Sequence, residues 1–225
     1  MSTRWVPGKS LAPYDAFNVG SRCGDDLSAV TENRASLAGR LGLPTQPCWL
    51  RQVHGARVVT VPPSPEPGSG AEPEADAAVA ERGVLAIQTA DCLPVLFCLP
   101  DGSRIGAAHA GWRGLAAGVL EATVVAMRGT PLAWMGPCIG AKSYEVGEEV
   151  RAAFVDGDRR AAGAFTTTRP GHWQCDLYAL ARLRLADAGV TAIRGGGFDT
   201  FTDDRFYSYR RDAGSSGRFV SLIWR

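Results

Sequence analysis

The chain lacks the marks of several protein classes. Its six cysteines include no CxxC pair and are too sparse in 225 residues for a disulfide scaffold. The first residues, MSTRWVPGKS, contain no apolar signal-peptide core, and no apolar run approaches the roughly 18 residues that a membrane helix needs. We therefore expect a cytoplasmic protein in a reducing compartment, with no membrane partner.

The chain also has no excess of positive or negative charge. The chain carries 24 basic and 23 acidic residues, a formal net charge of +1, and no basic run. This balance argues against a nucleic-acid partner. Only three histidines are present, which excludes a metal cluster that needs many imidazoles. No repeat of fixed period is visible, so solenoids and propellers are not expected.

What is present predicts one globular domain over residues 1–225, because 45% of the residues are hydrophobic. Short apolar runs bounded by Pro, Asp and Gly predict strands at 58–61, 76–80, 84–87, 94–99, 105–108 and 132–135. Helical spacing and capping residues predict helices at 27–41, 115–127, 144–155 and 176–188. We expect exposed or polar connections at 62–75 and 159–170, and a closing hairpin of 206–212 with 219–224.

Three polar side chains interrupt or end the apolar segments. Cys92 follows Asp91 inside an otherwise buried run, His109 ends the next strand, and His54 follows an extended segment. Two imidazoles and a thiolate suit a catalytic zinc site, in which a fourth position stays open to water. From the residues alone the alternatives stay open, since Cys92 could pack as a small hydrophobe and His54 could lie on the surface.

Other residues could contact a substrate. The glycine turn after His109 contains Arg113 at a helix start, where anions bind. Arg210 and Arg211 could hold a phosphate, or could belong to a solvated hairpin. Asn18 and Gln52 offer amides for a base or sugar edge, and Asp91 is a candidate base or a residue that orients Cys92.

The motifs QVHG, TADC and HAGWRG occur in this order, within longer matching segments such as FNVGSRCGDD, DAAVAERGVLAIQTADCLPVLF, MGPCIGAKSYEVGEEV and FYSYRRDAGSSGR. Together they make the chain similar to the YfiH-like family, also called laccase-domain or multicopper polyphenol oxidase proteins. The resemblance covers nearly the whole chain. It implies an α+β, single-domain layered sandwich with packed sheets inside and helices outside, and it implies that His54, Cys92 and His109 bind Zn²⁺.

The resemblance also implies zinc-dependent phosphorolysis of adenosine, inosine, guanosine and methylthioadenosine, with deamination of adenosine. The catalytic residues would then be Cys92, His109, His54 and Asp91. Purine nucleosides and phosphate would be the partners, and Arg4, Arg113, Arg210 and Arg211 could hold the phosphate. The H-x-E and PCxxC signature of base deaminases is absent. Asp199 stands where the family often has a cysteine, and Val6-Pro7-Gly8 replaces an early Gly-Gly.

Rival interpretations remain. Cys92 and His109 could form a Cys-His amide hydrolase that edits peptidoglycan precursors. Zinc could be purely structural in a non-catalytic protein. A single Cu²⁺ could occupy the same three ligands in a polyphenol oxidase (laccase), because copper binds most N/S sites more tightly than zinc does. The sequence does not distinguish a monomer from a homodimer.

Overall fold

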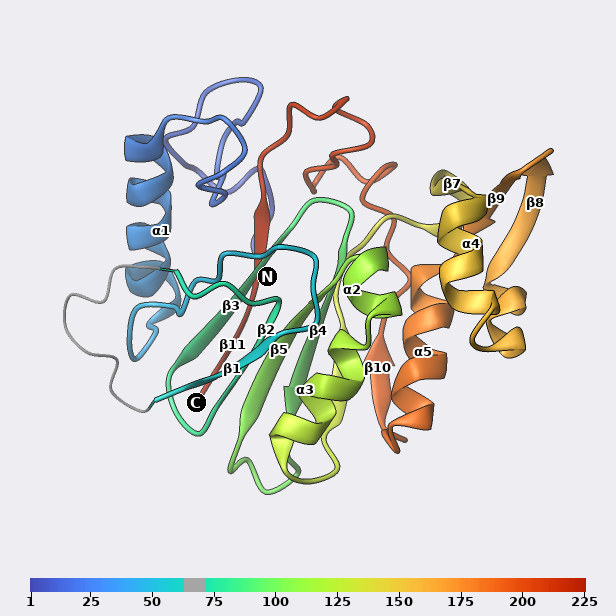
Figure 1. Ribbon diagram of the computed structural model, residues 1–225. Helices are drawn as coiled ribbons and strands as arrows, with labels where there is room; N and C mark the ends of the chain where they lie inside the picture. Colours follow the sequence, from blue (N-terminus) through green and yellow to red (C-terminus); the bar gives the residue numbers. More distant parts are fainter. Residues whose placement is uncertain (63–71) are drawn as a thin grey trace.

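The computed structural model describes residues 1–62 and 72–225 (Figure 1). Most of the loop predicted for 62–75 therefore lies outside the described residues. Among the residues that are described, no helix combines the length and the apolar content required to cross a bilayer.

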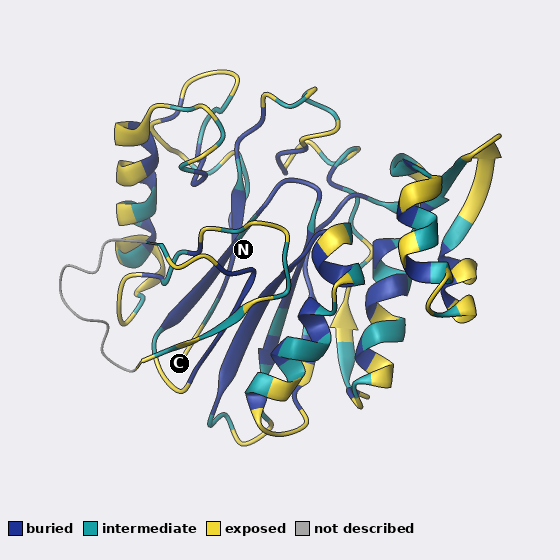
Figure 2. Ribbon diagram, in the orientation of Figure 1, coloured by how far each residue is buried: buried dark blue, intermediate teal, exposed yellow. Residues whose placement is uncertain are grey.

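A six-stranded sheet forms the centre of the molecule, in the order β1-β2-β5-β4-β6-β10. The strands are β1 (Val58–Val61), β2 (Ala77–Ala80), β4 (Leu93–Cys98), β5 (Ile105–Ala110), β6 (Leu132–Met135) and β10 (Ile193–Gly195). Only the outer pairs β1–β2 and β6–β10 are parallel. The β4 and β5 strands are buried on both faces, which explains their nearly continuous apolar sequences (Figure 2).

A second, two-stranded sheet pairs β3 (Val84–Thr89) with β11 (Phe219–Trp224) and packs on one face of the central sheet. Strand alternation sorts the side chains between the layers. On β5, Ile105 and Ala107 face the two-stranded sheet, whereas Ala108 and Ala110 face the opposite core. His109 shares its face with Ala107 and therefore lies on the side of β3.

Helices cover both outer surfaces (Figure 1). The α1 helix (Leu27–Leu41) packs on β3 and β11 through Leu37, while α2 (Trp112–Ala116), α3 (Val119–Met127) and α5 (Leu177–Asp187) cover the other face of the central sheet. The layers are thus helix, sheet, sheet and helix, which confirms the predicted layered sandwich. The predicted caps of α1 are confirmed as well, since Asp26 accepts a hydrogen bond from Ser28 N and Gly42 is left-handed.

Several predicted boundaries were wrong. The helix predicted for 115–127 is two helices, because Gly118 adopts φ 89° between them and the first begins at Trp112. The helix predicted for 144–155 is the strand β7 (Glu145–Gly147) followed by α4 (Glu148–Val155). The segment predicted as a polar connection holds the 3₁₀ helix η2 (Arg159–Ala164) and β8 (Phe165–Arg169), and β8 pairs with β9 (His172–Cys175). A further 3₁₀ turn, η1, spans Ala141–Ser143.

The predicted closing hairpin was also wrong. β11 pairs with β3 rather than with residues 206–212, because both of its faces are apolar and buried between layers. Residues 206–212 form turns instead, and the backbone N–H of Arg210 donates to the Asp91 carboxylate at 2.7 Å. This loop consequently lies beside the end of β3 and the start of β4, where the predicted site residues lie.

Candidate metal centre and substrate cavity

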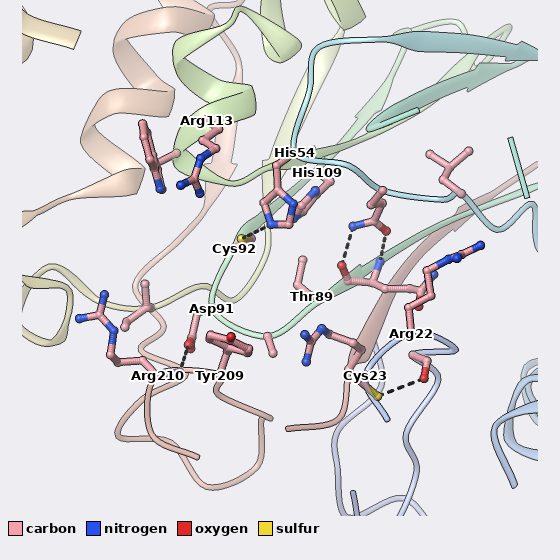
Figure 3. A pocket seen from close by; sticks show the side chains of 18 of the residues that line it. Arg22, Cys23, His54, Thr89, Asp91, Cys92, His109, Arg113, Tyr209 and Arg210 are labelled. Carbon is pink, nitrogen blue, oxygen red and sulfur yellow. Dashed lines mark hydrogen bonds between the residues drawn. The ribbon is translucent and has the colours of Figure 1, made fainter. Parts of the chain in front are cut away.

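His54, Cys92 and His109 converge although they are far apart in sequence (Figure 3). One ligand atom from each residue lies within 4.8 Å of the others. Cys92 Sγ is 3.9 Å from His54 Nε2, and the two imidazole rings meet edge to face with centroids 4.8 Å apart. Two imidazoles and a thiolate at this separation could hold one metal ion, with ligand types that suit zinc or copper.

Asp76 holds both histidines. Its Oδ1 lies 2.8 Å from His109 Nδ1 and accepts the backbone N–H of His54 at 2.9 Å. Its Oδ2 accepts the backbone N–H groups of Val53 and Gly55. Because Nδ1 is engaged by the carboxylate, Nε2 is the His109 nitrogen available to the cluster. His54 is held in a left-handed conformation, φ 62°, by the same loop contacts.

Two glycines of the HAGWRG motif leave room for this arrangement. A Cβ on Gly111 would lie 2.9 Å from Cys92 Sγ and 3.1 Å from His54 Cδ2. A Cβ on Gly114 would lie 2.7 Å from the Gly55 carbonyl oxygen. The start of α2 therefore packs directly on the cluster and on the loop that carries His54, which is possible only without side chains.

The electrostatics of the three side chains favour metal-ligand chemistry. Burial opposes ionisation of the Cys92 thiol, but the charge and the hydrogen bond of His109, with a smaller contribution from His54, lower the pKa of Cys92 below its usual value. Burial likewise opposes the charged form of His109, yet Cys92 and Asp76 raise the pKa of His109. A thiolate beside imidazoles is the donor set that soft and borderline metal ions select.

The cluster forms part of the wall of a cavity of about 570 Å³, within the size range of small-molecule sites. Figure 3 shows Arg113 and Arg210 on one side of the cluster and Arg22 and Cys23 on the other. The lining residues include Gly20, Ser21, Arg22, Cys23, Gln52, Glu72, Gln88, Thr89, Trp112, Arg113, Tyr144, Tyr209, Arg210 and Arg218. The cavity is therefore a cleft of mixed polar and apolar lining with arginines at both ends.

Three of the predicted substrate-binding residues line this cavity. Arg113 stacks on Trp112, and Arg210 stacks on Tyr144 while donating to the Glu145 carbonyl oxygen. Gln52 also lines the cavity, but its amide is engaged, because it donates to Gln88 O and accepts from Gln88 N. The Gln52 side chain thus bonds the backbone N–H and C=O of Gln88 near the end of β3, as the backbone of a neighbouring strand would.

The other three predicted substrate-binding residues, Arg4, Asn18 and Arg211, do not line the cavity. Asn18 is fully buried, and its amide bonds to Gly20, Asp25 and Arg218 N. Arg4 lies 3.7 Å from Asp15 and stacks on Tyr207. Arg211 donates to backbone carbonyls and to Asp212. The structure therefore places these three side chains within loop frameworks.

Asp91 is 8% exposed and left-handed, φ 83°, and both of its carboxylate oxygens are occupied. Oδ1 accepts the Thr200 hydroxyl at 2.6 Å, and Oδ2 accepts Arg210 N at 2.7 Å. Asp91 thus joins the loop that carries Cys92 to the loops that carry Thr200 and Arg210.

Sequence reasoning missed Asp76, Glu72, Tyr144 and Tyr209. The sequence predicts Asp76 only as the start of a strand, and Glu72 lies at the end of a segment rich in Pro, Gly and Glu. Asp199, the departure from the family pattern, accepts hydrogen bonds from Gly140 N and the Ser143 hydroxyl. It supports the loop after β6, and it is not among the residues that line the cavity.

This fold and site define a mixed α/β protein with a His-Cys-His cluster that faces a cavity; of its three members only His109 is buried, and His54 is exposed. The family model described as multi-copper polyphenol oxidoreductase laccase matches residues 1–225. The chain therefore belongs to this family, which confirms the expected resemblance.

Relatives of known name match almost the entire chain. The chain is 53% identical to a purine nucleoside phosphorylase of Xylella fastidiosa, over 97% of this chain and 88% of that protein. It is 52% identical to one from Pseudomonas aeruginosa (96% and 89%) and 47% identical to purine nucleoside phosphorylase YfiH of Escherichia coli (99% and 91%).

Solved structures give the same fold. A Neisseria meningitidis protein of family DUF152 superposes with a TM-score of 0.91 at 44% identity, over 99% of this chain and 91% of that one. YlmD of Geobacillus stearothermophilus superposes with a TM-score of 0.88 at 31% identity, over 99% and 89%.

Proposed function

We propose that this protein is a zinc-dependent purine nucleoside phosphorylase that accepts adenosine, inosine, guanosine and methylthioadenosine. The observation that carries the proposal is that one cavity of about 570 Å³ brings together the His54–Cys92–His109 cluster and two arginines suited to phosphate. Its volume accommodates a nucleoside together with phosphate. The names of relatives that are 47% to 53% identical support the same reaction.

Arg113 and Arg210 are the residues we assign to phosphate. Both guanidinium groups line the cavity on the same side of the cluster (Figure 3), and each lies over an aromatic ring that fixes its plane. Among the described residues neither has a carboxylate partner, so their positive charge remains available to an anion. Planar guanidinium groups bind phosphate oxygens in pairs of hydrogen bonds.

In the reaction, an oxygen of hydrogen phosphate forms a bond to C1′ of the ribose while the C1′–N9 bond breaks. The electron pair of the broken bond goes to the purine, and the proton carried by hydrogen phosphate ends on the purine nitrogen. Arg113 and Arg210 hold the phosphate next to C1′, and Asp91 positions Arg210 through its backbone N–H. Bound at His54, Cys92 and His109, zinc would supply a Lewis acid at this wall of the cavity.

The test is product analysis with metal-loaded protein. Guanosine, inosine, adenosine and methylthioadenosine are incubated with phosphate, and free base and ribose 1-phosphate, or its methylthio analogue, are measured. We expect Cys92→Ala to abolish both products and to lower zinc content. Cys98→Ala removes a thiol on β4 outside the cavity lining, so this variant should still form both products and bind zinc. Full activity of Cys92→Ala would refute the proposed site.

Adenosine deamination is the second activity we propose. It is favoured by the cluster, because three protein ligands leave room for water on the cavity side. Water oxygen would bond to C6 as the C6–N6 bond breaks, giving inosine and ammonia. Adenosine incubated without phosphate should then yield inosine, and the same Cys92→Ala variant should lose this product.

A Cys-His amide hydrolase is the alternative that the geometry also favours, since Cys92 Sγ lies 3.9 Å from His54 Nε2. Alkylation distinguishes the two. In the zinc enzyme the metal covers Cys92, so iodoacetamide should label it rapidly only after chelation. Rapid labelling of the metal-loaded protein would favour the hydrolase.

The family description raises copper as the third alternative. Elemental analysis of the purified protein, with a diphenol oxidation assay after loading with Cu²⁺ or Zn²⁺, tests it. We expect Zn²⁺ at one equivalent and no diphenol oxidation. A multicopper centre would need more imidazoles than the three in this sequence.

A further inference from the structure

One acidic side chain of the cavity stands apart from the chemistry described above. Among the described residues, two carboxylates line the cavity, those of Glu72 and Asp91. Both oxygens of Asp91 already accept hydrogen bonds from Thr200 and Arg210. Glu72 is therefore the acidic group with capacity left for a ligand.

The Glu72 carboxylate is held by hydrogen bonds to only one of its two oxygens. Its Oε1 accepts Arg34 Nη1 at 2.7 Å and the Ser21 hydroxyl at 3.5 Å. For Oε2, the nearest ion-pair contact within the described ranges is Arg22 Nε at 3.9 Å, which is longer than a hydrogen bond. Among the described residues, Oε2 therefore accepts no hydrogen bond and has capacity for one from a ligand.

Arg34 makes this placement rigid. Its Nε donates to Val19 O at 2.8 Å, and its guanidinium stacks over the Trp49 ring at 4.1 Å. Its Nη2 donates to Gln88, another residue that lines the cavity. A partly buried ion pair with 15% and 17% exposed side chains fixes the carboxylate, so little conformational entropy would be lost when a ligand binds.

The position of Glu72 selects the part of the substrate it meets. Glu72 contacts Ser21 and its neighbour Arg22. Figure 3 shows Arg22 on the side of the cavity away from Arg113 and Arg210. When phosphate displaces a purine in line, the incoming oxygen and the departing N9 lie on opposite sides of C1′. Phosphate at Arg113 and Arg210 therefore directs the base toward Ser21, Arg22 and Glu72.

We infer that Glu72 is a specificity-determining residue that accepts hydrogen bonds from the N–H groups of a 6-oxopurine base. This inference rests on the proposed nucleoside phosphorylase function. Guanine offers adjacent N1–H and N2–H donors to a carboxylate, and hypoxanthine offers N1–H. Adenine presents a bare N1 acceptor beside N6–H, which the carboxylate repels in part. Glu72 therefore favours guanosine over inosine, and inosine over adenosine.

The experiment compares Glu72→Gln with Glu74→Gln in the metal-loaded protein. The glutamine at 72 can still accept from Arg34, so the variant should fold, and thermal unfolding checks this. Glu74 is the matched control, since it lies on the same segment, pairs with Arg51 and is absent from the cavity lining. The measured quantity is kcat/KM for guanosine, 2′-deoxyguanosine, inosine and adenosine.

For Glu72→Gln we expect kcat/KM to fall roughly 10- to 100-fold for guanosine and for 2′-deoxyguanosine, and by less than about 3-fold for adenosine, as loss of a charge-assisted hydrogen bond predicts. Glu74→Gln should change none of them. An equal loss for all nucleosides would overturn the inference. So would a loss confined to substrates with a 2′-hydroxyl, which would mean that Glu72 contacts the ribose.

Equilibrium binding separates failure of this inference from failure of the proposed function. Guanosine is titrated by calorimetry without phosphate, where no phosphorolysis occurs; adenosine is left out because the proposed deamination would consume it. If the unmodified protein produces no ribose 1-phosphate, the proposed function fails. A guanosine affinity that still falls roughly 10-fold or more in Glu72→Gln would nevertheless support base recognition. Turnover with unchanged selectivity in Glu72→Gln would instead refute the role of Glu72 alone.

Discussion

Asp76 and His109 are joined by a hydrogen bond of 2.8 Å between Oδ1 and Nδ1, with the aspartate fully buried and the histidine side chain 4% exposed. Their backbones are bonded as well, since His109 N donates to Asp76 O at 2.7 Å. The antiparallel register of β2 and β5 places Ala77 opposite Ala108 and so sets these two residues side by side. The carboxylate therefore fixes both the ring orientation of His109 and the nitrogen that it presents to the cluster.

The variant Asp76→Asn should weaken metal binding roughly 10- to 100-fold, the usual cost of losing a group that orients a ligand. An asparagine cannot serve all of the present contacts. If its oxygen faces Val53 N and Gly55 N, its amide donates to His109 Nδ1, which forces the proton onto Nε2, the ligand atom. If it is flipped, the amide faces two backbone donors.

Zinc affinity measured by competition with a chromophoric chelator checks this prediction. Asp156→Asn, at an exposed position at the end of α4, is the matched control and should leave affinity unchanged. An unaltered affinity in Asp76→Asn would show that the His109 tautomer does not depend on the carboxylate.

Gly111→Ala should weaken metal binding by about 10-fold with little change in fold. The backbone at Gly111 has φ −65°, so alanine brings no backbone strain there. The added Cβ would lie 2.9 Å from Cys92 Sγ, and the sulfur must move away from the two imidazoles. Gly163→Ala, where a Cβ meets nothing within 4 Å, is the control. Equal metal affinities in the two variants would contradict the close packing of α2 on the cluster.

Gly39→Ala should stabilise the protein by about 0.5–1 kcal/mol, because glycine in a helix costs more backbone entropy than alanine. Gly39 lies within α1, and a Cβ there would meet nothing within 4 Å. The melting temperature should rise by roughly 1–4 °C for a chain of this length. Calorimetric unfolding measures it, and a lower melting temperature would show that α1 is not a regular helix at this residue.

The three candidate metal ligands could be predicted from the sequence because His109 ends an apolar strand, Cys92 interrupts an apolar run and His54 follows an extended segment. A polar side chain among apolar segments indicates a functional role, and two imidazoles with a thiolate indicate a metal site. The layered fold was also predictable, through the resemblance and through the buried strands. Asp76 could not be found this way, since its role depends on the register between β2 and β5, which is a tertiary property.

The predicted phosphate and base contacts were harder to sort for a similar reason. Arg4, Asn18 and Arg211 have the functional groups that a substrate needs, but Asn18 and Arg211 bond loop backbone groups and Arg4 pairs with Asp15. Composition cannot tell an arginine that holds a carbonyl from one that faces a cavity. For Arg210 and Arg211 the difference arises from the path of residues 206–212, which the sequence predicts as one strand of a hairpin and which form turns.

Asp91→Asn should raise the KM for phosphate about 10-fold while leaving zinc content unchanged. Asp91 Oδ2 accepts Arg210 N at 2.7 Å, and the Thr200 hydroxyl, at Oδ1, can turn to accept or donate. An asparagine can therefore satisfy Thr200 in either orientation, but it keeps Arg210 only when its oxygen faces that N–H. The weakened contact lets the Arg210 loop shift, and a displaced guanidinium binds phosphate less well. Steady-state kinetics at varied phosphate, with metal analysis of the same samples, checks the prediction. A fall in kcat at unchanged KM would instead indicate that Asp91 acts on the reacting atoms themselves.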